Sequence, residues 1–198
     1  RLYRMKTNQI ADELVRDITE GIDGTNVRAG LLGEIGAHFT WISPVEERMF
    51  RAVARAHQQT EVTIATHALN STVGLDQLDI LTEEGVDPRR IVIGHCQSFP
   101  HHDYHAEIAR RGAFVQFDRL GTINAYEHET DLRNIREMVE AGLIRHVLLS
   151  QDVCRRTDYA AYGGKGYAYI PNGLQEDLAQ VGVSEEQFHQ MAVDNPRR

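Results

Sequence analysis

Five short, almost wholly apolar segments constrain the fold of this chain more than any other feature. Such runs, without polar alternation, are typical of strands covered on both faces, as in parallel sheets. Successive runs begin about 20–35 residues apart, which is the spacing of βα units with right-handed crossovers. The sequence therefore predicts an α/β fold in one domain. The runs are AGLLGEIG, VTIAT, IVIGH, AFVQF and HVLLS, with strands expected near 29–34, 62–66, 91–95, 113–118 and 146–150.

Helices are predicted between these runs. Apolar residues recur at three- and four-residue steps through NQIADELVRDITEGI, and Gly21 and Gly24 mark the end of that helix. Pro44 falls in the first turn of the next helix, where its missing N–H costs little. Further helices are expected in SPVEERMFRAVARAHQQ, VGLDQLDILTEEG, DYHAEIARRG and HETDLRNIREMVEAG, and one or two more after the Gly/Tyr-rich segment DYAAYGGKGYAYIPNG.

Net charge limits the kinds of partner to expect, and cysteine content indicates the cellular compartment. The formal net charge of the 198 residues is −8, and no basic run exceeds two residues, so a surface built for nucleic acid or anionic lipid is not expected. Only Cys96 and Cys154 are present, which favours reduced thiols in the cytoplasm over a secreted disulfide scaffold. No apolar stretch is long enough to span a membrane. We expect a cytoplasmic protein with a small-molecule partner, no nucleic acid and no membrane.

Polar residues terminate each apolar run. Side chains at the carboxyl ends of parallel strands converge on one rim, where barrels and open α/β sheets place their chemistry. Imidazole and carboxylate are ligands that suit zinc, manganese, cobalt or iron. A carboxylate between apolar residues, as in LLGEIG, is expensive unless it is paired or holds a metal. The terminating residues are Glu34, His67, His95, Asp118 and Asp152.

Each of these residues also has a simpler interpretation. A single histidine at a strand end is more often a hydrogen-bonded structural residue, Asp118 suits a helix cap or turn, and Glu34 suits an ion pair with an arginine. Four such endings in strand order favour a metal site over these separate readings. The segment HHDYH at 101–105 is better explained as a solvated loop, and Cys96 as a small packed side chain.

Several blocks of the sequence together resemble the phosphotriesterase-related proteins of the amidohydrolase superfamily. These blocks are RAGLLGEIG, THA, IVIGHC, GAFVQFDRLG, LLSQDVC and the closing VDNPRR, and they extend from about residue 8 to the last residue. The resemblance implies a TIM (β/α)8 barrel with two divalent metal ions at its C-terminal rim. Zinc is the expected metal, with manganese, cobalt or iron as alternatives. A hydroxide that bridges the ions is implied as the attacking group.

The resemblance also implies a role for individual residues. Glu34 matches the glutamate-bridged branch of the family and would bridge the two ions. His67 and His95 correspond to the metal ligands of the fifth and sixth strands. Asp152 corresponds to the catalytic aspartate of the eighth strand, which binds one metal and takes a proton from the hydroxide. Arg119, within FDRLG, matches a position that faces the substrate in lactonase members.

Two departures from the family pattern shape the expectation. No His-x-His pair of the first strand is present, and five strands are readable where the barrel has eight. We therefore expect residues 1–198 to cover about strands 4–8, the C-terminal part of a single barrel domain whose first three strands lie upstream. Ser98 stands where relatives often carry an aspartate that relays protons, so the working of that relay is open.

The function expected from the resemblance is that of a metal-dependent hydrolase acting on a lactone, ester-like or amide bond. A phosphotriester or phosphodiester hydrolase on the same binuclear site is an alternative. A non-catalytic barrel fragment or binding protein that keeps the rim residues is another. Relatives often dimerise, so a homodimer is a further open expectation.

Overall fold

The computed structural model describes residues 2–38 and 40–198 of the chain. It is an α/β structure whose strands form a five-stranded sheet in the order β1-β2-β3-β4-β5. The pairings of β1 with β2, of β2 with β3 and of β4 with β5 are parallel, which confirms the predicted sheet type. The chain divides into two compact units, residues 1–94 and residues 95–198. The expectation of a single domain stays a prediction.

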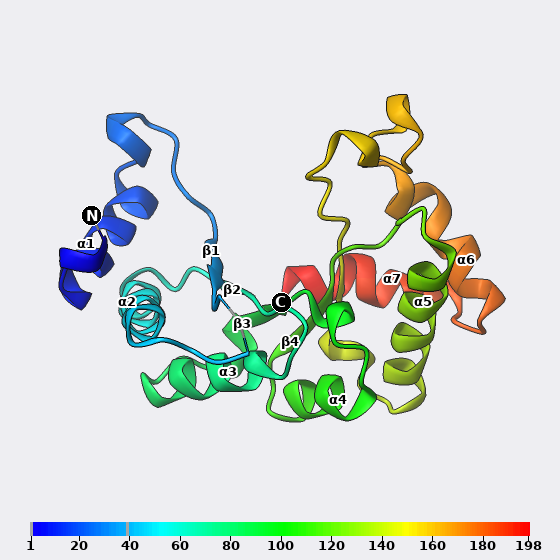
Figure 1. The fold of residues 1–198 in the computed structure, drawn as a ribbon, viewed down its shortest axis with the longest axis horizontal. Coiled ribbons are helices and arrows are strands. Elements are labelled where there is room, and N and C mark those ends of the chain that lie inside the picture. The colour runs from blue at the N-terminus through cyan, green and yellow to red at the C-terminus, as the bar shows by residue number, and fades with distance from the viewer. Residues whose placement is uncertain (1, 39) are drawn as a thin grey trace. The chain divides into compact units, whose positions relative to one another are not determined.

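Within its described residues, the first unit contains three strands and three α-helices, besides short 3-10 turns. Helix α1 packs against α2, with Ile10, Ala11 and Ala52 buried between them, and α2 lies beside α3 (Figure 1). Ser43 caps α2 by accepting a hydrogen bond from the Glu46 amide, as expected for a helix with proline at its start. The elements are α1 Thr7–Thr19, β1 Leu32–Gly36, α2 Pro44–Thr60, β2 Ile64–His67, α3 Val73–Glu83 and β3 Ile91–Gly94.

The first strand differs from its prediction in position and in burial. It spans Leu32–Gly36 rather than 29–34, because pairing with the neighbouring segment begins only where the Leu32 amide donates to the Thr63 carbonyl, 3.0 Å away. Glu34 therefore lies inside the strand and is exposed. In the described residues β1 pairs with only one strand, and its register shifts between Leu32 and Ile35.

The two glycines that flank Glu34 allow β1 to approach β2 closely. A Cβ atom on Gly33 would lie 2.5 Å from the Ala65 carbonyl oxygen, so a larger residue would force the strands apart. A Cβ atom on Gly36 would lie 3.3 Å from the Cβ of His67 and would press on that side chain. The sequence GEIG thus carries a carboxylate on a strand that lies directly against the histidine of its neighbour.

The second unit begins with His95 and contains two strands and four helices. Its strands supply buried apolar side chains such as Val115, Phe117 and Val147. A π-helical turn, Ile170–Leu174, leads into α6, and another, Gln190–Asp194, follows α7. The elements are α4 His102–Arg110, β4 Phe114–Phe117, α5 Ala125–Glu140, β5 Val147–Leu149, α6 Gln175–Gln180 and α7 Glu185–His189.

The segment between β5 and α6 is held together by aromatic and charged side chains. Tyr159 and Tyr167 stack edge to face with ring centroids 5.9 Å apart. The ammonium of Lys165 lies 4.0 Å from the centre of the Tyr169 ring, and the hydroxyl of Tyr169 donates to Asp177 at 2.6 Å. This Gly/Tyr-rich segment is therefore structured and is joined to α6. Among the described residues, no helix is long and apolar enough to cross a bilayer.

Candidate metal centre

Three predicted ligands come from adjacent strands: Glu34 from the middle of β1, His67 from the end of β2 and His95 from just after β3. His67 is the last residue of β2, and in the parallel register it lies opposite Gly36 of β1 and Gly94 of β3. His95 directly follows Gly94, the last residue of β3. One ligand atom from each of Glu34, His67 and His95 lies within 4.8 Å of the other two. In the part of the chain that the structure describes, no second group of three meets this limit.

The donor set and its spacing fit a divalent transition-metal ion. Bonds of about 2.1 Å place two ligand atoms on one ion at most about 4.2 Å apart, so a group within 4.8 Å needs only small side-chain shifts to close on an ion. Two imidazoles and one carboxylate suit zinc, manganese, cobalt or iron rather than calcium or magnesium, which prefer oxygen ligands. The residues present therefore fit the predicted metal.

The three ligands differ in burial. Glu34 is exposed and His67 is half-buried, whereas His95 is only 4% exposed. A pocket of about 300 Å³ lies beside His67 and is lined by Gly36, Ala37, His38, Glu46 and Leu69. Burial opposes the ionisation of Glu46, but hydrogen bonds from Ser43 and His38 outweigh it and lower the pKa of Glu46. The pocket therefore contains a carboxylate that is already used to hold the β1–α2 loop.

The surroundings of His95 contain a further carboxylate. Asp118 follows β4, and its Oδ1 lies 2.7 Å from Nδ1 of His95, while its Oδ2 accepts a hydrogen bond from the His95 amide at 2.7 Å. The side chain of Gln97 donates to the same Oδ1 at 2.8 Å and accepts from the Asp118 amide at 3.1 Å. Asp118 is thus neither a helix cap nor a solvated turn residue, and it contacts the candidate ligand directly.

Two predicted site residues lie outside the three-residue group. Asp152 follows β5, is half-buried and has a left-handed backbone with φ of 44°. Arg119 follows Asp118 and is half-buried. Its charge acts on Asp131 of α5, a buried acid. The assignments of Asp152 as a ligand and proton acceptor and of Arg119 as a substrate contact stay predictions.

Two buried groups near His95 are poor candidates for chemistry. Burial, and then the nearby charge of Asp118, raise the pKa of the Cys96 thiol, which keeps this side chain protonated and unreactive. His105 is fully buried, and burial lowers its pKa to about 4 although its Nε2 lies 2.8 Å from the Cys96 carbonyl oxygen. Both residues therefore serve the packing around the end of β3, as predicted for Cys96. The prediction of a solvated loop for residues 101–105 is wrong, because α4 begins at His102 and its first turns bury Tyr104 and His105 against the protein.

Gln97 is the residue that sequence reasoning missed. Nothing in its type marks it, because a glutamine two residues after a histidine is ordinary. Asp118 was visible as the polar ending of β4, but its partner was not assigned. Since β3 and β4 are neighbours in the sheet order, the residues that follow them, 95 and 118, are the ones that strand order would bring together.

Comparison with known proteins gives consistent matches over the chain. The sequence model described as "Phosphotriesterase family" matches residues 3–198. The phosphotriesterase homology protein of Escherichia coli is 39% identical over 188 residues, which cover 95% of this chain and 64% of that protein. The aryldialkylphosphatase of Saccharolobus solfataricus is 38% identical over 209 residues, which cover 96% of this chain and 64% of that protein.

Solved structures agree with these matches. A crystal structure of the Escherichia coli phosphotriesterase homology protein, with phosphate in its active site, superposes with a TM-score of 0.94 at 37% identity and covers 98% of this chain and 67% of that one. A lactonase from Listeria monocytogenes superposes with a TM-score of 0.89 at 30% identity and covers 98% of this chain and 61% of that one. The chain thus spans about three fifths of the length of the curated relatives it matches.

Proposed function

Because this chain belongs to the phosphotriesterase family, as its sequence blocks indicated, we propose that it forms part of a metal-dependent hydrolase of the TIM-barrel type, covering about strands 4–8. The observation that carries the proposal is the group of Glu34, His67 and His95, whose ligand atoms lie within 4.8 Å of one another. Relatives named as a lactonase and as an aryldialkylphosphatase support hydrolysis as the reaction class.

In this proposal different residues of the chain bind the metal, accept a proton and orient the substrate. Glu34, His67 and His95 would hold the divalent ions, zinc being the expected metal, with the Glu34 carboxylate as the shared ligand. When bound, the ions would lower the pKa of a water molecule and polarise the oxygen of the bond to be broken. Asp152 would be a further ligand, and its carboxylate would serve as the proton acceptor. Arg119 orients the substrate through its guanidinium, which presents several hydrogen-bond donors to a carbonyl or carboxylate oxygen.

The substrate proposed is a small molecule with a lactone, ester-like or amide bond. The structural similarity to a lactonase from Listeria monocytogenes supports this choice. The similarity to an aryldialkylphosphatase supports phosphotriester hydrolysis as a second candidate. A panel of lactones, N-acyl amino acids and organophosphates separates the two, and faster turnover of the organophosphates than of every lactone would reverse the order.

The metal content of the natural full-length protein tests the proposal. We expect about two equivalents of zinc or a similar ion per chain by elemental analysis, and loss of turnover when a chelator removes them. Glu34→Gln should lose metal and turnover together, because the amide cannot bridge two cations. Glu176→Gln, a change of an exposed acid on α6, is the matched control and should retain both.

Two results would contradict the proposal. Less than half an equivalent of metal in the wild-type protein would favour the alternative of a binding protein without catalysis. Wild-type metal content in Glu34→Gln would remove Glu34 from the site while leaving the histidines as candidates.

A further inference from the structure

We propose that Asp118 is a positioning residue that holds the imidazole of His95 in one tautomer, with its proton on Nδ1, and so directs the lone pair of Nε2 toward the metal group. Gln97 holds Asp118 in place for this task. The inference rests on the proposed metal site and adds two residues that act behind its ligands. It follows from a chain of hydrogen bonds whose directions are fixed at both ends by the backbone.

The first fixed direction is set by the amide of Asp118. A backbone N–H can only donate, so the Gln97 atom that lies 3.1 Å from it must be the side-chain oxygen. The other end of the Gln97 amide is then the NH2 group, and it donates to Oδ1 of Asp118 at 2.8 Å. The orientation of this glutamine side chain is therefore determined by the main chain.

The second fixed direction is set by the amide of His95. This N–H donates to Oδ2 of Asp118 at 2.7 Å, so that oxygen is an acceptor. Oδ1 already accepts from Gln97, and it lies 2.7 Å from Nδ1 of His95. Both oxygens of Asp118 thus act as acceptors, and we assign the hydrogen of this contact to Nδ1 of His95 as the donor. In a neutral imidazole the lone pair must then lie on Nε2.

Burial gives the arrangement its strength. The side chains of His95 and Asp118 are only 5% and 6% exposed, so water cannot compete for the contact. A hydrogen bond in such surroundings is electrostatically stronger than one in water, and leaving one partner unmatched is correspondingly costly. The backbone of His95 is in the left-handed region with φ of 57°, the conformation in which its own amide donates to Asp118. Asp118 therefore contacts both the backbone amide and the imidazole ring of His95.

The expected consequence is a higher affinity for the ion. Metal-binding histidines commonly donate their second ring N–H to a carboxylate, which fixes the tautomer and raises the basicity of the ligating nitrogen. Loss of such a partner typically lowers metal affinity 10- to 100-fold. Glu34 and His67 would still be present, so the effect is a weakened site and not an abolished one.

Asp118→Asn is the informative change, because it conserves shape but not polarity. If the amide oxygen faces the ring, the NH2 group opposes the His95 amide, and two donors meet. If the oxygen faces the amide, the NH2 group opposes Nδ1 and favours the tautomer with its proton on Nε2. In metal-free protein labelled with ¹⁵N at histidine, long-range ¹H–¹⁵N correlations should show a single Nδ1–H tautomer for His95 in the wild type. They should show loss of that single state in Asp118→Asn.

Zinc affinity is the second readout, measured by competition with a chromophoric chelator on the full-length protein. We expect Asp118→Asn to bind zinc 10- to 100-fold more weakly. Gln97→Ala, which leaves both atoms of the Asp118–His95 contact in place, should weaken binding less. Asp103→Asn, a change of an exposed aspartate in the first turn of α4, is the control and should bind as the wild type does. Circular dichroism confirms that each variant is folded, and Gln97→Ala serves if Asp118→Asn is not.

The outcomes separate this inference from the proposed function. Wild-type zinc affinity and an unchanged His95 tautomer in Asp118→Asn would overturn the inference and leave the hydrolase proposal intact. A wild-type protein that binds no zinc would overturn the hydrolase proposal, and the tautomer measurement would still decide whether Asp118 orients the ring.

Discussion

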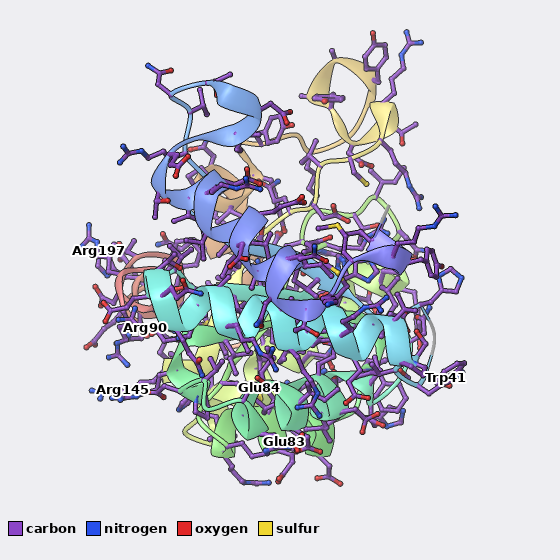
Figure 2. The ribbon with its side chains drawn as sticks, turned by 90° about the vertical axis from the view of Figure 1, so that its left-hand side faces the viewer. Trp41, Glu83, Glu84, Arg90, Arg145 and Arg197 are labelled. Atoms are coloured by element: carbon purple, nitrogen blue, oxygen red, sulfur yellow. The ribbon has the colours of Figure 1, made fainter. Side chains whose placement is uncertain are left out.

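Carboxylates meet nitrogen donors at similar distances in two regions of this molecule, in opposite surroundings. On the surface of α2 and α3, Arg51 contacts Glu47, Glu83 and Glu84 at 2.7, 2.9 and 2.8 Å, and Figure 2 shows Glu83 and Glu84 below α2. In the second unit, Asp118 contacts His95 at 2.7 Å. The side chain of Glu83 is 66% exposed, whereas that of Asp118 is 6% exposed.

The difference teaches that distance alone does not report what a polar contact contributes. Exposed pairs are screened by water and salt and typically contribute about 0–1 kcal/mol. Removing one partner of a buried hydrogen bond leaves the other partner unsatisfied, which typically costs about 1–3 kcal/mol for each such group. We therefore expect the contacts around Arg51 and the contact of Asp118 to respond very differently to substitution.

Asp118→Ala should produce the largest loss. It leaves the His95 amide and the Gln97 side chain without their acceptor in a buried place. We expect the free energy of unfolding of metal-free protein to fall by about 3–5 kcal/mol in urea denaturation, because several hydrogen-bonding groups are left unsatisfied at once. A loss below about 1 kcal/mol would show that the buried Asp118 contact contributes no more than an exposed pair, and it would contradict the difference drawn between the two regions.

Asp131→Asn should have a smaller effect that depends on pH. Burial, and then the charges of Glu127 and Asp118, raise the pKa of Asp131 from its ordinary value of 3.8 to about 7. Between these values the folded protein holds a proton that the unfolded chain releases, so stability falls as pH rises from about 4 to 7. Replacement by asparagine removes this loss, which is less than about 4 kcal/mol.

Unfolding measured at pH 4 and at pH 7 checks this expectation for Asp131. The variant should gain stability over the wild type at the higher pH only. An equal difference at both values would show that Asp131 does not titrate in this range, and that its burial is compensated in another way.

Glu84→Gln should have the smallest measurable effect. Glu84 contacts both Arg51 and Arg55, and the first of these lowers the pKa of Glu84 the most. We expect a loss of about 0.5–1 kcal/mol at low ionic strength that shrinks in 1 M salt. Asp87→Asn, in an exposed pair with Arg89, is the control and should cause no measurable change. A salt-independent loss in Glu84→Gln would indicate packing instead of charge.

The sequence predicted most of what depends on local pattern. Apolar runs located β2 to β5 to within two or three residues, because buried parallel strands need continuous apolar side chains. The histidines at positions 67 and 95 followed from the rule that parallel strands present their ends on one rim, and the structure groups them with Glu34. The ligating roles of these three residues, and those of Asp152 and Arg119, stay predictions.

What escaped prediction depends on contacts between distant segments. The exposure of Glu34 results from the pairing of β1 with one described neighbour and from an irregular register, neither of which is encoded in LLGEIG itself. The role of Gln97 depends on a tight turn after His95 that brings its side chain to Asp118. The residue types do not indicate the exposure of Glu34 or the role of Gln97, because tertiary contacts determine both.

The left-handed backbone of His95 has a consequence for engineering. Glycine adopts this conformation without steric penalty, whereas other residues carry a cost of order 1 kcal/mol or more. His95→Gly would relieve the backbone strain at this position, but it would also remove the imidazole. Residue 95 is therefore a position where heat stability and the proposed metal site place opposite demands on one side chain.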